Sequence, residues 1–210
     1  MSRLVGDRGG LYLEVVKPAL DVLLVIAAAP FVVPLVLVLA FLVALDGGKP
    51  FYSQERVGKG GRTYRIWKLR TMDVDADEKL AAFLSANPLA RAEWDHCQKL
   101  RHDPRITYLG RLLRRTSLDE LPQLWNVLLG DMSLVGPRPM MVSQKALYPG
   151  EAYYALRPGI TGLWQVSARN ESGFAERASY DFEYWRTVSL ATDFRLLAAT
   201  VRVVTRGTGC

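Results

Sequence analysis

The sequence predicts an α+β protein that is mostly helical, with an N-terminal membrane segment over residues 1–46 and a small domain on the cytosolic face over residues 47–210. Three observations support this expectation. A run of 24 residues from Val22 to Leu45 carries no charged or polar side chain. Two short alternating segments around a glycine-rich turn predict a β-hairpin. Most of the remaining chain has helical periodicity, with amphipathic faces suited to the membrane interface.

The apolar run predicts a membrane helix, since about 20 apolar residues cross the roughly 30 Å core of a bilayer. Pro30 and Pro34 lie mid-run, and each bends or breaks a helix. Two arms of about 12 residues, at about 1.5 Å per residue, reach only the bilayer midplane. Basic residues flank both ends of the run, which draws both ends to the cytoplasmic side. A re-entrant hairpin that turns near Pro34 satisfies both facts. A proline-kinked spanning helix is the alternative, and a cleaved signal peptide is disfavoured because the run is too long.

Asp21 immediately precedes the run, and its carboxylate has two interpretations. The one we favour is that it complements the positive end of the helix dipole in the first turn. The other is that it ties the membrane helix to a basic group at the interface.

Phe51 to Arg56 and Thr63 to Trp67 predict the two strands of the β-hairpin, joined by a turn that contains three glycines. Lys68 and Arg70 continue the second segment and alternate with apolar residues, so both side chains are expected on one face. Two cations on one face predict an anion between them, with surface solvation as the alternative.

The rest of the domain predicts helices joined by turns. Two of them, Ile106–Arg115 and Ala191–Thr205, are basic and amphipathic, and such helices can lie on an anionic membrane surface. The apolar face of the second could also serve a homodimer. Val135–Pro139 predicts rigid irregular backbone, and Pro158–Gly162 predicts a turn. The other predicted helices cover 75–100, with an interruption at Asn87-Pro88, and 121–129, 153–157 and 178–185.

The net charge of +6 and the pI near 9.4 favour an anionic partner. Seven Lys and Arg residues fall between Lys49 and Arg70 against one acid. There they would attract anionic headgroups by about 1 kcal/mol each. No basic stretch alternates with aromatic residues in a nucleic-acid motif, so no nucleic-acid partner is predicted. Two cysteines and two histidines without ligand-spaced partners disfavour a disulfide framework, a zinc site and thiol or histidine catalysis.

The segment Ser117-Leu118-Asp119-Glu120 has the Ser-x-x-Glu spacing of a capping box. On that interpretation Glu120 only satisfies a backbone N–H at a helix start. Pro122, five residues after Ser117, makes Asp119 the alternative cap. Both interpretations place the two carboxylates in the first turn of a helix, beside its positive end.

That position also suits chemistry. The helix start and nearby Arg114 and Arg115 are expected to keep Asp119 ionised and nucleophilic, and to attract a phosphate. Glu120 could hold Mg²⁺, which binds one or two carboxylates together with phosphate oxygens. Arg138 lies between two prolines, and a guanidinium on rigid backbone suits bidentate phosphate binding, with a structural salt bridge as the alternative. Together these groups meet the needs of a phosphoryl transfer.

The 21 residues from Asp119 to Pro139 closely resemble the signature of the bacterial sugar transferases. These are the monotopic phosphoglycosyl transferases that start exopolysaccharide and O-antigen assembly. Lys68–Met72 resembles the family's Lys-Phe-Arg-Ser/Thr-Met motif, and Phe51–Gly58 is similar to its first strand and turn. The resemblance covers nearly the whole chain. Its other matches are Lys17, Asp21 and Pro34 in the membrane hairpin, Arg157–Gly162, Gln165-Val166 and Arg169-Asn170.

The resemblance implies a ping-pong reaction at the bacterial inner membrane, with the catalytic domain on its cytoplasmic face. Asp119 would attack the sugar-linked phosphate of a UDP-sugar, expel UMP and carry the phosphosugar. Undecaprenyl phosphate would then accept that group, and Glu120 would hold Mg²⁺. The motifs place substrate contacts at Arg56, Lys68, Arg70, Arg114, Gln123, Asn126, Arg138 and Pro139.

Two features depart from the family pattern. Val33 precedes Pro34 where relatives often have a serine, and Pro30 adds a second bend, so the hairpin angle stays open. Longer members carry spanning helices and an extra domain ahead of this region. The chain therefore resembles the short form that acts in succinoglycan-type exopolysaccharide synthesis.

A non-catalytic membrane scaffold of polysaccharide assembly with the same fold is the alternative function. The intact Asp119-Glu120 pair argues against it. A glycosyltransferase that moves the sugar alone is a second alternative, and it would release UDP in place of UMP. No motif selects the hexose, and galactose and glucose are family-level expectations.

Overall fold

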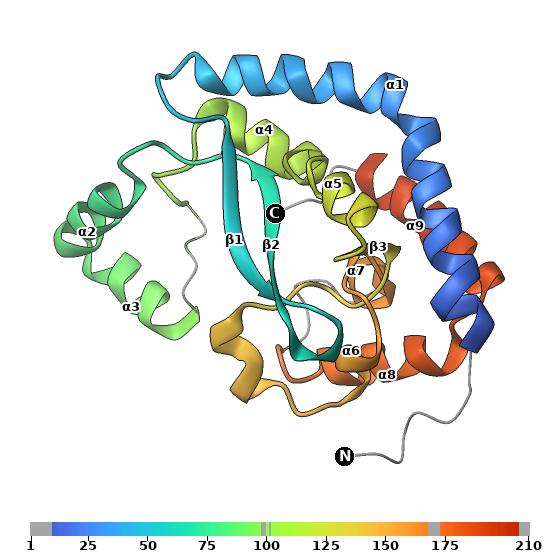
Figure 1. Ribbon diagram of the computed structural model, residues 1–210. Coiled ribbons are helices and arrows are strands. Elements are labelled where there is room, and N and C mark those ends of the chain that lie inside the picture. The colour runs from blue at the N-terminus through green and yellow to red at the C-terminus, as the bar shows by residue number, and fades with distance from the viewer. Residues whose placement is uncertain (1–9, 98–99, 101, 168–172, 206–210) are drawn as a thin grey trace.

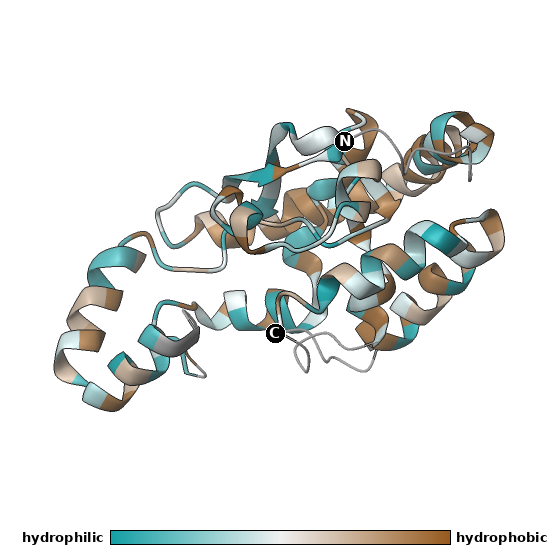
Figure 2. Ribbon diagram, turned by 90° about the horizontal axis from the view of Figure 1, so that it is seen from below, coloured by the Kyte–Doolittle hydropathy of each residue, from teal (hydrophilic) through white to brown (hydrophobic). Residues whose placement is uncertain are grey.

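The computed structural model describes residues 10–97, 100, 102–167 and 173–205. The motif residues Arg169 and Asn170 lie outside the described residues. The fold is mostly helical, as predicted, and a two-stranded sheet of β1 and β2 stands near its centre (Figure 1). A long bent helix, α1 (Lys17–Ala44), runs along two sides of the domain. The helix pair α2 (Ala76–Ala86) and α3 (Pro88–Cys97) projects from the domain in the views of Figures 1 and 2.

Helix α1 (Lys17–Ala44) continues from a π-helical turn (Tyr12–Val16). It passes through Pro30 and Pro34 as one helix, and Figure 1 shows a sharp bend between its two arms. The expected break is therefore a bend inside a continuous helix. Each proline removes one backbone hydrogen bond and displaces a carbonyl, which bends the helix without ending it. By length and composition, Tyr12–Ala44 is the one candidate membrane helix in the described ranges, and most of its surface is exposed.

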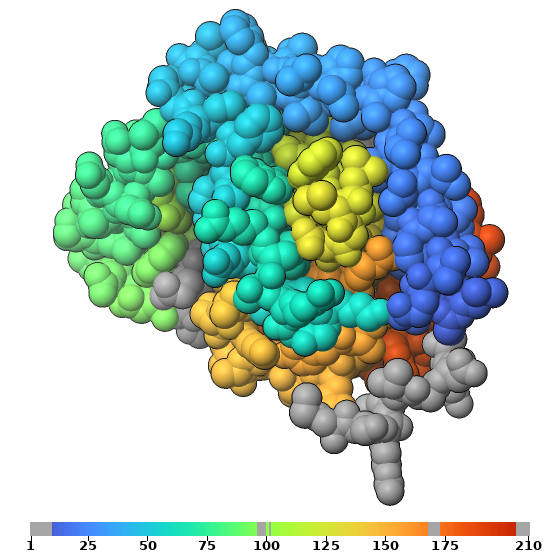
Figure 3. All heavy atoms as spheres, in the orientation of Figure 1, coloured from blue at the N-terminus to red at the C-terminus, as the bar shows by residue number. Residues whose placement is uncertain are grey.

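The two arms of α1 each contact the domain, whereas the middle of the helix does not bury a residue. In the first arm, Val25 packs against Ile66, Val127 and Met132. In the second arm, Leu39, Ala40 and Val43 pack against Leu69 and Leu113. Figure 3 shows the two arms along two sides of the surface of α5 (Gln123–Leu128).

Buried polar contacts also fix the first arm. Nζ of Lys17 lies 2.5 Å from Oδ2 of Asp193 in α9 (Leu190–Thr205). Asp21 accepts a hydrogen bond of 2.6 Å from the Ser133 hydroxyl and lies 3.5 Å from a guanidinium nitrogen of Arg157. The favoured interpretation of Asp21 as a dipole acid is therefore wrong. The buried carboxylate instead ties α1 to a basic group of the domain, Arg157.

Strands β1 (Phe51–Val57) and β2 (Thr63–Leu69) form the predicted antiparallel hairpin, with Phe51 opposite Leu69 and Val57 opposite Thr63. The turn is a short 3₁₀ segment (Lys59–Gly61) in which Gly60 has φ +69°. A positive φ suits glycine because it has no Cβ.

A second sheet was not predicted. Strands β3 (Ser133–Val135) and β4 (Gly159–Thr161) pair in parallel. The expected irregular backbone at Val135 and the expected turn at Pro158–Gly162 are wrong at these residues. Three-residue strands are too short to show alternation. The contact also needs two glycines, since a Cβ on Gly159 would lie 2.1 Å from the backbone nitrogen of Gly136.

The helices of the domain follow the predicted order with shifted ends. Helix α4 starts at Tyr108 and not at Ile106, because the Thr107 hydroxyl caps it by accepting from Gly110 N at 2.8 Å. The 3₁₀ segment Val142–Leu147 and helix α7 were not predicted. The remaining bounds are α2 Ala76–Ala86, α3 Pro88–Cys97, α4 Tyr108–Thr116, α5 Gln123–Leu128, α6 Ala152–Ala155, α7 Leu163–Ser167 and α8 Arg177–Thr187.

Candidate active site

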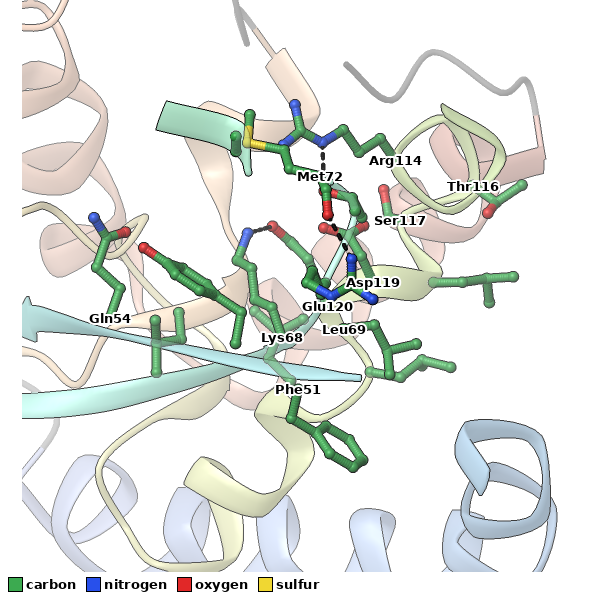
Figure 4. A pocket seen from close by; sticks show the side chains of 18 of the residues that line it. Phe51, Gln54, Lys68, Leu69, Met72, Arg114, Thr116, Ser117, Asp119 and Glu120 are labelled. Atoms are coloured by element: carbon green, nitrogen blue, oxygen red, sulfur yellow. Dashed lines mark hydrogen bonds and ion pairs between the residues drawn. The ribbon is translucent and has the colours of Figure 1, made fainter. Parts of the chain in front are cut away.

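A cavity of about 1180 Å³ opens beside the central hairpin and contains the predicted acidic pair (Figure 4). Its walls come from β1 and β2, the start of α2, the connection between α4 and α5, the loop after β3, and α7 and α9. Segments far apart in the sequence thus meet around one space. The predicted site residues on the wall are Arg56, Lys68, Arg70, Arg114, Asp119, Glu120 and Arg138.

Asp119 lies in a 3₁₀ turn (Leu118–Glu120) between α4 and α5. Ser117 ends α4 in the left-handed conformation, with φ +57°, and redirects the chain toward the cavity. Neither predicted cap is present: no side chain caps the turn, and α5 begins at Gln123 after Pro122. Neither carboxylate therefore serves as the expected side-chain cap, and both lie in a 3₁₀ turn ahead of α5 and not in the first turn of an α-helix.

The Asp119 side chain is buried, with 8% of the residue exposed. Burial raises the pKa of Asp119 to about 6, Lys68 and Arg114 oppose the rise, and the Glu120 carboxylate adds to it. At neutral pH the carboxylate is still mostly ionised, as expected. Arg115, however, is exposed and is not among the groups that act on this pKa.

Glu120 forms an ion pair with Lys68, whose Nζ lies 2.7 Å from Oε1 of the glutamate (Figure 4). Burial favours the neutral form of Glu120. Lys68, Arg138 and Arg56 outweigh burial and hold the pKa of Glu120 below its usual range. Asp119 and Glu120 therefore differ in chemistry, because one carboxylate is destabilised by burial and the other is neutralised by a lysine.

Arg70 lines the cavity but is bound to the end of α1. Its guanidinium donates to Val43 O at 3.1 Å, to Lys49 O at 2.9 Å and to Met72 O at 2.8 Å, and it pairs with Asp46. Lys68 and Arg70 each have a protein carboxylate of their own. The expected shared anion is therefore not required to explain the two cations.

Arg56 and Arg114 are held on the wall by neutral acceptors. Arg114 Nε donates to the Thr71 hydroxyl at 2.9 Å (Figure 4). Arg56 donates to Gln54 Oε1 at 2.6 Å and to the carbonyl of Pro139 at 3.4 Å. Since these partners carry no charge, both guanidinium groups keep their full positive charge at the cavity.

Arg138 sits on the rigid backbone that its two prolines predict. The Pro137 carbonyl accepts from Gly159 N at 2.8 Å, and Met140 N donates to the Tyr153 hydroxyl at 3.2 Å. The Arg138 guanidinium lies over the ring of Trp164, 5.8 Å from its centre. Among the described residues Arg138 forms no ion pair. The alternative of a structural salt bridge is therefore not observed there.

Three predicted contacts lie off the cavity wall. Asn126 is 1% exposed, and its amide accepts from Trp67 N at 3.2 Å and donates to Arg65 O at 2.8 Å. It therefore closes the free edge of β2. Gln123 is 2% exposed beside it. Pro139 acts through its carbonyl, which positions Arg56.

Other wall residues were missed as site residues. Gln54, Thr71 and Ser117 position or adjoin the predicted cations and acids, and their neutral side chains gave no signal of their own. Trp164 and Gln165 also line the cavity. They lie just after the Arg157–Gly162 motif, separated from it by Leu163, so the position of that motif was the signal that could have found Trp164.

The donor set of the acidic pair fits Mg²⁺ in type. Two adjacent carboxylates supply the hard oxygen ligands that this ion takes alongside phosphate oxygens and water. In the described ranges no group of three or more His, Cys, Asp and Glu residues gathers as a metal cage. An ion here would therefore depend on substrate phosphate for part of its coordination, and it would compete with Lys68 for Oε1 of Glu120.

The sequence matches the family model described as bacterial sugar transferase over residues 12–207. The undecaprenyl-phosphate galactose phosphotransferase of Salmonella typhimurium is 46% identical over 178 residues, which are 84% of this chain and 37% of that protein. The exopolysaccharide production protein ExoY of Sinorhizobium fredii is 43% identical over 191 residues, 90% of this chain and 84% of that protein. The UDP-glucose:undecaprenyl-phosphate glucose-1-phosphate transferase of Caulobacter vibrioides is 37% identical over 196 residues, 88% of this chain and 68% of that protein. The chain spans about two fifths of the length of several curated relatives that it matches.

Proposed function

The chain belongs to the bacterial sugar transferase family, and from that membership and the cavity we propose that it transfers a sugar 1-phosphate from a UDP-sugar to undecaprenyl phosphate. This would be the first step of exopolysaccharide or related glycoconjugate synthesis. The observation that carries the proposal is Asp119, a buried carboxylate on the cavity wall that is ionised at neutral pH in the field of Lys68 and Arg114.

In the first half-reaction, a carboxylate oxygen of Asp119 attacks the phosphorus that carries the sugar. A new acyl phosphate bond forms. The bond from that phosphorus to the bridging oxygen breaks, and UMP leaves with this oxygen and the bonding electrons. No proton has to move, because the nucleophile is a carboxylate and the leaving group is a phosphate. The step needs Asp119 in its ionised form.

In the second half-reaction, a phosphate oxygen of undecaprenyl phosphate attacks the same phosphorus. Asp119 leaves as a carboxylate, and a lipid diphosphosugar forms. Gly47 and Gly48, which come shortly after Ala44 at the end of α1, lie on the cavity wall. A lipid phosphate at the membrane surface would therefore meet the cavity close to the anchor.

The cations of the wall would stabilise the charge on the transferred phosphate in both steps. Preorganised donors are most effective where water is excluded. Glu120 would hold Mg²⁺ together with substrate phosphate oxygens, and the ion would neutralise charge there when it is bound. Removal of Mg²⁺ with EDTA should abolish turnover, and added Mg²⁺ should restore it in the native chain and not in Glu120→Gln.

The exposed apolar surface of α1 supports a membrane anchor, and we place the domain on the cytoplasmic face of the bacterial inner membrane. The bend in α1 supports a re-entrant anchor with both ends on that face. The test uses Leu11→Cys and Lys49→Cys in a chain whose native Cys97 and Cys210 are changed to serine. An impermeant maleimide should label neither position in intact spheroplasts and both after lysis. Labelling of only one in intact cells would show a spanning helix.

The activity is tested by incubating the membrane-embedded protein with undecaprenyl phosphate and either UDP-galactose or UDP-glucose. We expect UMP release and a phosphosugar mass on the peptide that contains Asp119, both absent in Asp119→Asn. Release of UDP would instead indicate transfer of the sugar alone. No nucleotide release with any UDP-sugar, and no adduct, would favour the non-catalytic scaffold. The UDP-sugar that gives the fastest UMP release would identify the sugar that is transferred.

The predicted homodimer is tested separately, by measuring the molecular mass of the protein in detergent.

A further inference from the structure

The cavity contains five arginines, and four of them use their N–H donors on the protein itself. Arg56 and Arg114 donate to neutral acceptors, Arg105 pairs with Asp103 at 2.6 Å, and Arg70 binds Asp46 and three carbonyls. Arg138 differs from them. Within the described ranges its guanidinium makes no hydrogen bond, and its contact is the face of the Trp164 ring.

Trp164 is itself part of a stack that continues away from the cavity. The Arg177 guanidinium lies 4.1 Å from the centre of the Trp164 ring and 5.0 Å from that of Phe174. It is therefore in contact with two rings. Phe174 in turn meets Tyr148 edge-on at 6.3 Å. The stack Arg138–Trp164–Arg177–Phe174 connects the cavity wall to the first turn of α8.

We propose that Trp164 and Arg177 are positioning residues for Arg138, and that they hold its guanidinium at the cavity to bind the diphosphate of the nucleotide sugar. The inference rests on the proposed function, which supplies the diphosphate ligand.

The physical reason is that a ring fixes a guanidinium without using its N–H groups. A carboxylate partner would orient Arg138 equally well, but it would neutralise the charge and occupy the forked donors that bind phosphate. A cation over an aromatic face keeps both the charge and the in-plane donors. The prolines on either side of Arg138 fix its backbone, so the Trp164 ring needs to order only the Arg138 side chain.

Arg177 adds positive charge behind Trp164. Burial and the nearby Arg138 lower the pKa of Arg177 to about 10, while Asp181 opposes that shift. Arg177 is thus still protonated at neutral pH, in a cluster where like charges repel one another. A phosphate bound at Arg138 would relieve this repulsion, whereas a neutral ligand would not.

The test compares the affinity of the full-length protein for UDP, by titration calorimetry, across variants of the stack. Trp164→Leu should weaken UDP binding about tenfold, the middle of the range for a partly buried cation–π contact. Trp164→Phe keeps a ring and should stay within about threefold of the native protein. Arg177→Met should weaken binding in the same direction. Arg186→Met is the matched control, because Arg186 lies over Phe182 on the same helix but is not on the cavity wall.

A purely structural role predicts a different pattern. It would lower the melting temperature of Trp164→Leu and Trp164→Phe without separating their UDP affinities. Equal UDP affinity in native protein, Trp164→Leu and Arg177→Met would overturn the inference, while UMP release by the native protein would leave the proposed function standing. Absence of both UDP binding and UMP release in the native protein would overturn the two together. In turnover, the expected signature is a raised donor KM in Trp164→Leu with a smaller change in kcat.

Discussion

Nζ of Lys68 lies 2.7 Å from Oε1 of Glu120, and the same ammonium group lowers the pKa of Asp119. One lysine on β2 therefore serves two adjacent carboxylates with opposite tendencies. It neutralises Glu120, and it limits the rise that burial imposes on the pKa of Asp119. The lysine reaches both because it is at the end of β2, which faces the turn between α4 and α5.

Lys68→Met should destabilise the protein at neutral pH by about 1–3 kcal/mol, because it leaves Glu120 largely buried without its partner. In the native protein the pKa of Glu120 is below the unfolded value of 4.5, so its ion pair stabilises the fold above that pH. That contribution is lost as the pH falls through the folded pKa. In the variant the pKa of Glu120 in the folded state should rise above 4.5, so the ionised Glu120 should then lower the stability of the fold above that pH. Urea unfolding at pH 7 and pH 4 measures the effect, and a deficit of equal size at both pH values would contradict it.

Asp119→Asn should abolish activity and stabilise the fold. The folded pKa of about 6 lies above the unfolded value of 3.8, so the ionised aspartate lowers stability progressively between these pH values. The full cost at pH 7 is at most about 3 kcal/mol, from about 1.4 kcal/mol per pKa unit. The gain in the free energy of unfolding of Asp119→Asn over the native protein should shrink toward pH 4, as measured by urea unfolding. Asp95→Asn, at an exposed position on α3, is the control that should show no such trend.

The same pKa sets the pH dependence of the first half-reaction. In the native protein, the rate of UMP release in a single turnover should rise with pH through about 6 and then level off, because only the ionised aspartate attacks. A rate independent of pH between 5 and 7 would exclude Asp119 as the titrating nucleophile.

Much of this site was readable from the sequence, because charge and rigid backbone leave local signals. Asp119, Glu120, Lys68 and Arg138 meet at the cavity as their motifs predict. Neutral anchors leave no such signal. Asn126 stands among site-like residues in the sequence, yet its amide is used by the backbone of β2. Only the long-range pairing of α5 with β2 reveals this use.

The fold shows the same division between local and long-range information. The β1–β2 hairpin was predicted, since both strands and their turn are contiguous. The β3–β4 pair was not, because Ser133 and Gly159 are far apart in sequence and their strands have three residues each. The bend of α1 was expected from Pro30 and Pro34. The packing of its two arms against the domain was not, because the partners of each arm lie far from it in the sequence.

Ser117→Gly should retain or raise stability, by up to about 1 kcal/mol, whereas Ser117→Val should lower it by about 1–2 kcal/mol. Ser117 has a φ of +57°, a conformation that glycine adopts freely and that a β-branched side chain resists. Thermal unfolding measures both changes. A Gly variant less stable than the Val variant would show that the hydroxyl outweighs the backbone strain.

Arg70 was predicted as a substrate contact, but its partners indicate that it fastens the end of α1 to β2. The guanidinium holds the pKa of Asp46 below its usual range, which reports a favourable pair. The Asp46 side chain is 41% exposed, so the pair itself should contribute about 0.5–1 kcal/mol. Arg70→Met should cost more, about 1–3 kcal/mol, because it also frees the carbonyls of Val43, Lys49 and Met72. A double-mutant cycle with Asp46→Asn, followed by urea unfolding, separates the two parts. If Arg70 were instead a substrate contact, Arg70→Met would raise the donor KM while leaving the unfolding free energy unchanged.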